Sequence, residues 1–89
     1  MDFETAVQYV NARIVKKNMT DRDRLMVYGL FKQANKGDAP LSPPEIKKEN
    51  AFRLMKWVSW KNFRGISAEQ AKEYYCLHVK QMQERDGDS

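Results

Sequence analysis

The most informative stretch of this 89-residue chain is Val27-Tyr28-Gly29-Leu30-Phe31-Lys32-Gln33-Ala34. If the stretch is helical, Tyr28 and Lys32 lie one turn apart on one face. With Phe31 alongside, this face offers a phenol, a second ring and a cation, which suits a ligand that carries both a phosphate and a flat base. Alone, the pattern fits an ordinary amphipathic helix equally well, with Tyr28 in the core and Lys32 reaching solvent over apolar surface.

Helical spacing of apolar residues continues on both sides of this stretch. It predicts a first helix that ends near Lys16-Lys17, whose charges complement the helix dipole. The apolar positions of that helix are Phe3, Ala6, Val7, Val10 and Ile14. Thr20 and Asp23 resemble a capping box that opens the second helix, and Gly37 is placed to stop it.

Two further helices follow a connection, Gly37 to Pro44, that contains all three prolines of the chain. We expect the third helix to start between Glu49 and Ala51 and to end at Gly65. Its many aromatic residues predict a place at the centre of the core, with Trp60 mainly buried. A fourth helix opens with a Ser67 and Gln70 capping box. Its apolar face carries Ala71, Tyr74, Tyr75, His78, Val79 and Met82.

The pattern predicts an all-α fold in which residues 1–89 form one domain, a small four-helix bundle. Short links favour antiparallel neighbours, whereas the long link between the second and third helices permits these two to run in the same direction. The expected order is therefore up, down, down, up. Mean hydropathy of -0.79 and 42% apolar residues are globular proportions.

Composition argues against an enzyme and against a membrane or secreted protein. A domain of this size has little room for an enclosed active site. Cys76 and His78 are too few for a zinc site, and two residues apart on a helix they point about 200° apart, which excludes a nucleophile and base pair. A lone cysteine, an acidic N-terminus and the lack of a long apolar stretch predict a cytoplasmic protein.

Several dispersed motifs resemble the acyl-CoA-binding protein family. Tyr28-Gly-Leu-Phe-Lys-Gln-Ala followed by Gly37-Asp38 resembles its signature. Lys56-Trp57 with Trp60 resembles a second family motif. Other positions that fit the family in order are Phe3-Glu4, Ala6, Val10, Gly65, Ser67 and Tyr75. The resemblance covers nearly the whole chain.

This resemblance implies a non-catalytic carrier that holds and pools medium- to long-chain acyl-CoA esters. Tyr28, Lys32 and Lys56 would bind the ribose 3′-phosphate, and Phe31 and Tyr75 would lie against the adenine. Leu25 would help to cover the acyl chain, and Gly29 and Leu30 belong to the signature's ligand-binding stretch. We expect no metal, no cofactor and no catalytic residue. The protein is expected to be a monomer that contacts membranes or enzymes at most transiently.

Some positions depart from the family pattern. Phe31 stands where many members have tyrosine, so it keeps a ring surface but lacks a hydroxyl donor. Arg24 stands where an apolar residue often lines the acyl groove, which leaves the preferred chain length open. Met19 and Asn35 replace a usual proline and a usual small residue.

Two other functions compete with a small-molecule carrier. A net charge of +4 and a pI near 9.3 fit a nucleic-acid-binding module, but the basic residues alternate with acids and never exceed two in succession. A helical protein-interaction adaptor is disfavoured because no sustained apolar heptad remains once the bundle has its core.

Overall fold

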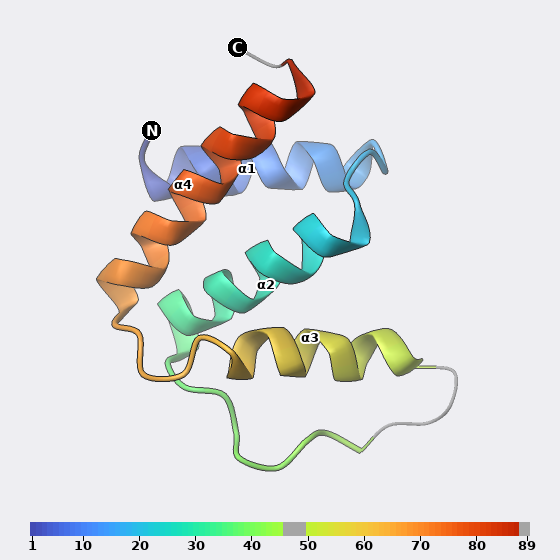
Figure 1. Ribbon diagram of the computed structural model, residues 1–89, viewed down its shortest axis with the longest axis vertical. Coiled ribbons are helices and arrows are strands. Elements are labelled where there is room, and N and C mark those ends of the chain that lie inside the picture. The colour runs from blue at the N-terminus through green and yellow to red at the C-terminus, as the bar shows by residue number, and fades with distance from the viewer. Residues whose placement is uncertain (46–49, 88–89) are drawn as a thin grey trace.

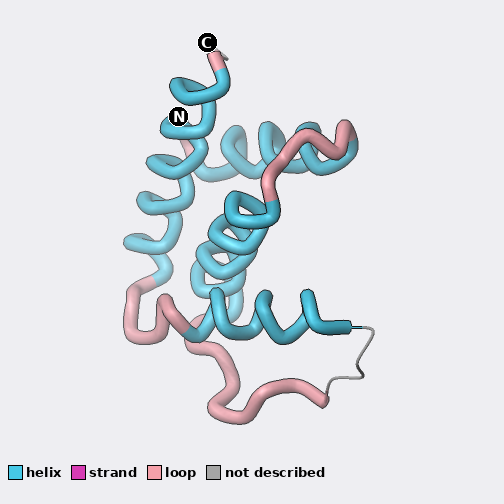
Figure 2. Tube along the Cα trace, turned by 45° about the vertical axis from the view of Figure 1, so that its right-hand side comes forward, coloured by secondary structure: helices cyan, strands magenta, loops and turns pink. Residues whose placement is uncertain are grey.

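Four α-helices make up the computed structural model, which describes residues 1–45 and 50–87 (Figure 1). They are α1 (Phe3–Val15), α2 (Asp21–Lys36), α3 (Ala51–Lys61) and α4 (Ala68–Asp86). Within these residues there is no strand, and the remaining backbone is turn or loop (Figure 2). The all-α class predicted from periodicity is therefore confirmed.

The helices run in the expected order of directions. In Figure 1, α1 runs from left to right, α2 and α3 both run from right to left, and α4 rises back toward α1. The long connection after α2 crosses the molecule and lets α3 start on the same side as α2. α3 begins at Ala51, inside the predicted interval, whereas Glu49 lies outside the described residues.

Side-chain caps begin three of the helices. The Asp2 carboxylate accepts a hydrogen bond from the Thr5 backbone N–H at 2.8 Å, and the Thr20 hydroxyl accepts one from the Asp23 N–H at 3.1 Å. At α4 both bonds of the predicted Ser67 and Gln70 capping box are present. These bonds satisfy backbone donors that have no partner within the helix.

Glycine ends α2 but not α3. Gly37 has φ +79°, a conformation that favours glycine, and it caps α2 as predicted. The prediction that Gly65 terminates α3 is wrong, because the helix stops at Lys61. Gly65, with φ +89°, is instead the last residue of the turn between α3 and α4.

The core lies between α1, α2 and α4. α4 packs on both α1 and α2, and α3 packs on α2 alone among the described helices. The buried core residues are Ala6, Val10, Val27, Leu30, Tyr75, Val79 and Met82. No described residue of α3 is fully buried, so the prediction that this helix forms the centre of the core is wrong.

The two tryptophans of α3, Trp57 and Trp60, bind the backbone of the proline-rich connection. The Trp60 indole N–H donates to the Gly37 carbonyl at 2.7 Å, and the Trp57 indole N–H donates to the Pro40 carbonyl at 3.0 Å. Arg64 donates to the Ala39 carbonyl at 3.1 Å. Prolines remove backbone donors from the segment, so these side chains satisfy carbonyls that a helix would have satisfied internally.

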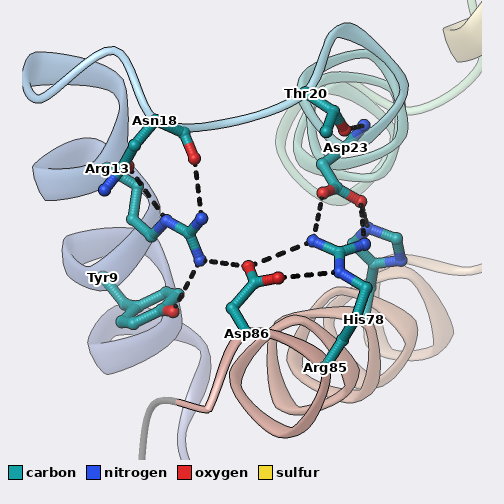
Figure 3. Close-up of polar contacts among 8 residues, drawn as sticks. All are labelled: Tyr9, Arg13, Asn18, Thr20, Asp23, His78, Arg85 and Asp86. Atoms are coloured by element: carbon teal, nitrogen blue, oxygen red, sulfur yellow. Dashed lines mark hydrogen bonds and ion pairs between the residues drawn. The ribbon is translucent and has the colours of Figure 1, made fainter.

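A chain of charged side chains joins α1 to α4 at the C-terminal end of α1 (Figure 3). Arg13 donates to the Asp86 carboxylate at 2.7 Å and to the Asn18 carbonyl at 2.7 Å. Its guanidinium also donates to the Tyr9 hydroxyl at 3.0 Å. Asp86 in turn accepts from Arg85 at 2.9 Å. The end of α1 and the turn after it are thus fixed to the last turn of α4.

The same chain continues from α4 to a buried carboxylate on α2. Asp23, whose side chain is 3% exposed, accepts from Arg85 at 2.6 Å and lies 3.1 Å from the His78 Nε2 atom (Figure 3). Burial alone raises the pKa of Asp23, but hydrogen bonds from Arg85, Thr20 and His78 hold it below the ordinary value. Asp23 is therefore ionised at neutral pH and links the start of α2 to the end of α4.

Replacing Asp23 with asparagine is expected to lower the free energy of unfolding at pH 7 by ~1–3 kcal/mol, because Arg85 loses the charged acceptor that joins it to α2 and keeps only Asp86. A carboxyl whose pKa is lowered by folding stabilises the protein above its ordinary pKa of 3.8, and this contribution disappears as pH falls through the lowered value. The stability difference between the two proteins should therefore shrink below about pH 4.

Urea unfolding of both proteins between pH 7 and pH 2 measures this difference. Other carboxylates with lowered pKa values, such as Asp38, are present in both proteins and cancel in the comparison. A difference that stays constant across the acid range would contradict the assignment.

Candidate functional site

A cleft of about 220 Å³ lies between α1 and α2. There is room for it because the backbones of α1 and α2 do not approach each other closely among the described residues, and each helix packs on α4. Apolar side chains of α1 and α2 form its walls, and α3 and α4 contribute the rest. The lining residues are Val7, Val10, Asn11, Ile14, Arg24, Val27, Tyr28, Phe31, Phe52, Lys56 and Tyr75.

Two ammonium groups from different helices meet at the Tyr28 ring. Lys32 Nζ on α2 lies 5.8 Å from the ring centroid, and Lys56 Nζ on α3 lies 5.2 Å from it. Lys32 is also 5.6 Å from the Trp60 ring, and Lys56 is 5.6 Å from the Phe52 ring. Neither lysine forms an ion pair with a described carboxylate. Aromatic faces attract these cations and leave their N–H donors open to an anion.

Three rings from α1, α2 and α4 form a second cluster beside the cleft. The Phe3 and Phe31 rings stack with centroids 6.2 Å apart, and Phe3 meets the edge of Tyr75 at 5.1 Å. Phe31 is 39% exposed, whereas Tyr75 is 2% exposed. Burial raises the pKa of the Tyr75 phenol, so it stays neutral. The cluster therefore presents a ring surface, with no charge of its own.

The structure brings together five of the eight residues that the sequence singled out. Tyr28, Phe31, Lys56 and Tyr75 line the cleft, and Lys32 stands over the Tyr28 ring. The periodicity of α4 left Tyr74 and Tyr75 as alternatives for the inward tyrosine. Tyr75 is the buried one, and Tyr74 is 46% exposed.

The other three residues lie elsewhere. Leu30 is buried in the core. Gly29 faces α3, where an added Cβ would approach the Ser59 carbonyl oxygen to 2.8 Å. Leu25 lines a separate apolar groove of about 540 Å³ between α2 and α3. That groove also contains Arg22, Met26, Leu54, Met55, Val58, Ser59, Asn62 and Phe63.

Sequence reasoning missed the α1 wall of the cleft, Phe3 in the ring cluster and Phe52 on α3. The signal for Val7, Val10 and Ile14 was their helical spacing, which marked one face of α1. Spacing shows which residues share a face, but it does not show whether that face meets another helix or an open cleft. Phe52 carries no comparable signal beyond its place one turn before Lys56.

The described cleft lining contains no cysteine, histidine or carboxylate. The one cysteine, Cys76, is half-buried away from the cleft lining, and burial raises the pKa of its thiol, which disfavours the thiolate. Among the described residues there is no group of three or more side chains placed to hold a metal ion. No helix in the described ranges combines the length and apolarity needed to cross a membrane.

Comparison with known sequences gives consistent similarities. The family model for acyl CoA binding protein matches residues 1–79. The acyl-CoA-binding protein of Ricinus communis is 36% identical over 81 residues, which cover 91% of this chain and 86% of that protein. The acyl-CoA-binding protein of Brassica napus is 34% identical over 90 residues, which cover 99% of this chain and 91% of that protein.

Two rice proteins extend the comparison to a longer protein and to a solved structure. The chain is 38% identical to acyl-CoA-binding domain-containing protein 3 of Oryza sativa, but it spans only 51% of that protein's length. The crystal structure of Oryza sativa acyl-CoA-binding protein 2 matches with a TM-score of 0.78 and 32% identity. That match covers 98% of this chain and 92% of the rice chain.

Proposed function

Because this chain belongs to the acyl-CoA-binding protein family, a family of non-enzymatic binding proteins, we propose that it binds one medium- to long-chain acyl-CoA ester and carries it unchanged. The observation that supports this most is the position of Lys32 and Lys56 over the Tyr28 ring, at an apolar cleft. An acyl-CoA has both an anionic head and an apolar chain, and this arrangement offers a partner to each.

The head group would be held by charge and by ring contact. In this proposal Lys32, Lys56 and the Tyr28 hydroxyl bind the ribose 3′-phosphate, and charge-assisted bonds of this kind contribute ~1.5–3 kcal/mol each. Phe31 offers an exposed ring to the adenine. Tyr75 is almost fully buried, and its ring, with the centroid 6.5 Å from that of Phe31, supports the Phe31 ring.

The chain would supply most of the gross affinity. About 15 methylenes at ~0.8 kcal/mol each give ~12 kcal/mol before ordering costs of several kcal/mol are subtracted. The cleft is smaller than the ~300–1,000 Å³ of sites that enclose a ligand, so a long chain would lie partly open along it. Contact with Leu25 stays a prediction that requires the chain to reach the groove between α2 and α3.

Calorimetric titration with hexadecanoyl-CoA tests this function. We expect saturation at one ligand per chain, with much weaker binding of hexadecanoate and of free CoA, because each lacks one half of the ligand. Tryptophan fluorescence should change with the same stoichiometry, since the Trp60 ring lies 5.6 Å from the Lys32 ammonium. Absence of both heat and fluorescence change, or equal affinity for hexadecanoate, would contradict the proposal.

We further infer that the protein acts in the cytoplasm as a monomer, needs no cofactor, binds no nucleic acid and meets membranes or enzymes only transiently. The interspersed acids and bases of the sequence support the exclusion of nucleic acid. Sedimentation of the chain with and without hexadecanoyl-CoA would test the monomer.

A further inference from the structure

The cleft contains a third cation that the proposed head-group site does not use. Arg24 lies one helical turn before Tyr28 on α2, and it lines the cleft. Its guanidinium carbon is 5.2 Å from the Phe52 ring centroid. Eight residues of α-helix separate Arg24 from Lys32, which places their Cα atoms ~12 Å apart along the helix axis. Along α2 the cleft thus has cations at two levels, Arg24 and Lys32, while the Lys56 ammonium on α3 lies 5.6 Å from the same Phe52 ring as Arg24.

Arg24 differs from the arginines that join the helices through carboxylates. Arg13 and Arg85 are paired with Asp86 and Asp23. Among the described residues no carboxylate pairs with Arg24, and none of the described residues that line the cleft is acidic. The Phe52 ring contact leaves the donors at the edge of the guanidinium available.

The chemistry of the bound ligand determines whether the positive charge of Arg24 strengthens or weakens binding. Arg24 is exposed in the structure, and a plain methylene chain laid against its guanidinium would remove water without offering an acceptor in return, which is costly. A carboxylate at the end of the chain offers two acceptor oxygens that match the guanidinium fork. Asn11, on the α1 wall of the same cleft, adds an amide that can donate to the same group.

We propose that the protein prefers acyl-CoA esters whose chain ends in a carboxylate, with Arg24 as the residue that binds this second anion. The inference rests on the proposed function, since it concerns the chain of the same ligand. It assigns the two cationic levels of the cleft to two ends of one molecule, with the 3′-phosphate at Lys32 and Lys56 and the terminal carboxylate at Arg24.

The test is a comparison of plain and ω-carboxylated acyl-CoA esters on the natural protein and on Arg24→Met. Calorimetry gives the affinity of each for matched pairs of octanoyl, dodecanoyl and hexadecanoyl esters, and for free CoA. Methionine keeps an unbranched apolar stem and removes the charge. Arg53→Met is the matched control, because Arg53 is an exposed arginine on α3 that lines neither the cleft nor the groove.

At the chain length that fits best, Arg24→Met should shift the preference for the carboxylated over the plain ester by at least tenfold, or ~1.4 kcal/mol. The plain ester should bind the variant as tightly as the natural protein, or more tightly. Arg53→Met should change neither the preference nor the affinity for the plain ester.

Three results would overturn the inference. Equal weakening of both esters and of free CoA would make Arg24 a head-group residue. An unchanged preference at every chain length would leave Arg24 without a role in the cleft. An equal shift with Arg53→Met would reduce the effect to general charge. If the natural protein binds no plain ester at all, the proposed function fails first, and the hexadecanoyl-CoA titration reveals this separately.

Discussion

Gly29→Ala should lower the free energy of unfolding by ~1–3 kcal/mol, the cost of overpacking a closely fitted contact. The added Cβ would lie 2.6 Å from the Ser59 hydroxyl oxygen, 2.8 Å from the Ser59 carbonyl oxygen and 2.9 Å from a Phe63 ring carbon. The carbonyl belongs to the backbone of α3 and cannot rotate away. At an open position inside a helix the same change would instead stabilise by roughly 0.5–1 kcal/mol, so the sign of the effect tests the packing.

Urea unfolding of the natural protein and Gly29→Ala measures this effect, and Lys36→Ala on the exposed end of α2 serves as the control. The control should change stability by less than ~0.5 kcal/mol. Because α3 packs on α2 alone among the described helices and carries Lys56, a displaced α3 should also weaken hexadecanoyl-CoA binding. Equal or greater stability of Gly29→Ala would show that the two helices are not in close contact here.

The double variant Lys32→Ala and Lys56→Ala should lose ~10²–10⁴-fold in affinity for hexadecanoyl-CoA, the sum of two charge-assisted bonds of ~1.5–3 kcal/mol each. Both ammonium groups stand over Tyr28 and neither pairs with a described carboxylate, so they have no structural ion pair to lose. The fold difference in affinity between the natural protein and the double variant should become smaller as salt is raised. Screening weakens the proposed bonds between the two lysines and the phosphate in the natural protein.

Lys36→Ala with Lys80→Ala is the matched control, since it removes the same charge from exposed positions on α2 and α4. Calorimetry of both variants, with urea unfolding to show that they remain folded, separates a local contact from net charge. If the control loses as much affinity as the Lys32 and Lys56 variant, the lysines act only through the overall field, and the site assignment is wrong.

Local chemistry made much of the fold predictable. Ser67 and Gln70 predict the start of α4 because the capping box is a contact within four residues. Gly37 predicts the end of α2 because the backbone conformation at that position favours glycine. Helical spacing placed Ala71, Val79 and Met82 on the buried face of α4, although it left Tyr74 and Tyr75 as alternatives for the inward tyrosine. Each of these signals is contained in one helix or one turn.

Features that depend on distant parts of the chain were not predictable. Asp23 was expected to act within the cap of α2, yet its carboxylate binds His78 and Arg85, which are 55 and 62 residues away. Trp57 and Trp60 of α3 share a side of the helix, but their indoles bind carbonyls of the connection after α2, whereas Phe52 lines the cleft.

The candidate site was also predictable only in part. The resemblance to a known family placed Tyr28, Lys32 and Lys56 in one site, and the structure brings their side chains together. The resemblance did not show that Arg24 and Leu25 line different hollows. These neighbours differ by about 100° around α2, and the structure places them in two different hollows.

The attachment of α1 at both ends has a consequence for the thermodynamics of loading. The Phe3 ring fixes its start against Phe31 and Tyr75, and Arg13 fixes its end through Asp86. The wall opposite α2 is therefore preorganised before a ligand binds. A ligand loses conformational entropy on binding, whereas the protein loses little. Differences in affinity among ligands should then reflect the contacts that each ligand makes, because the free-energy cost of rearranging the protein is nearly the same for all of them.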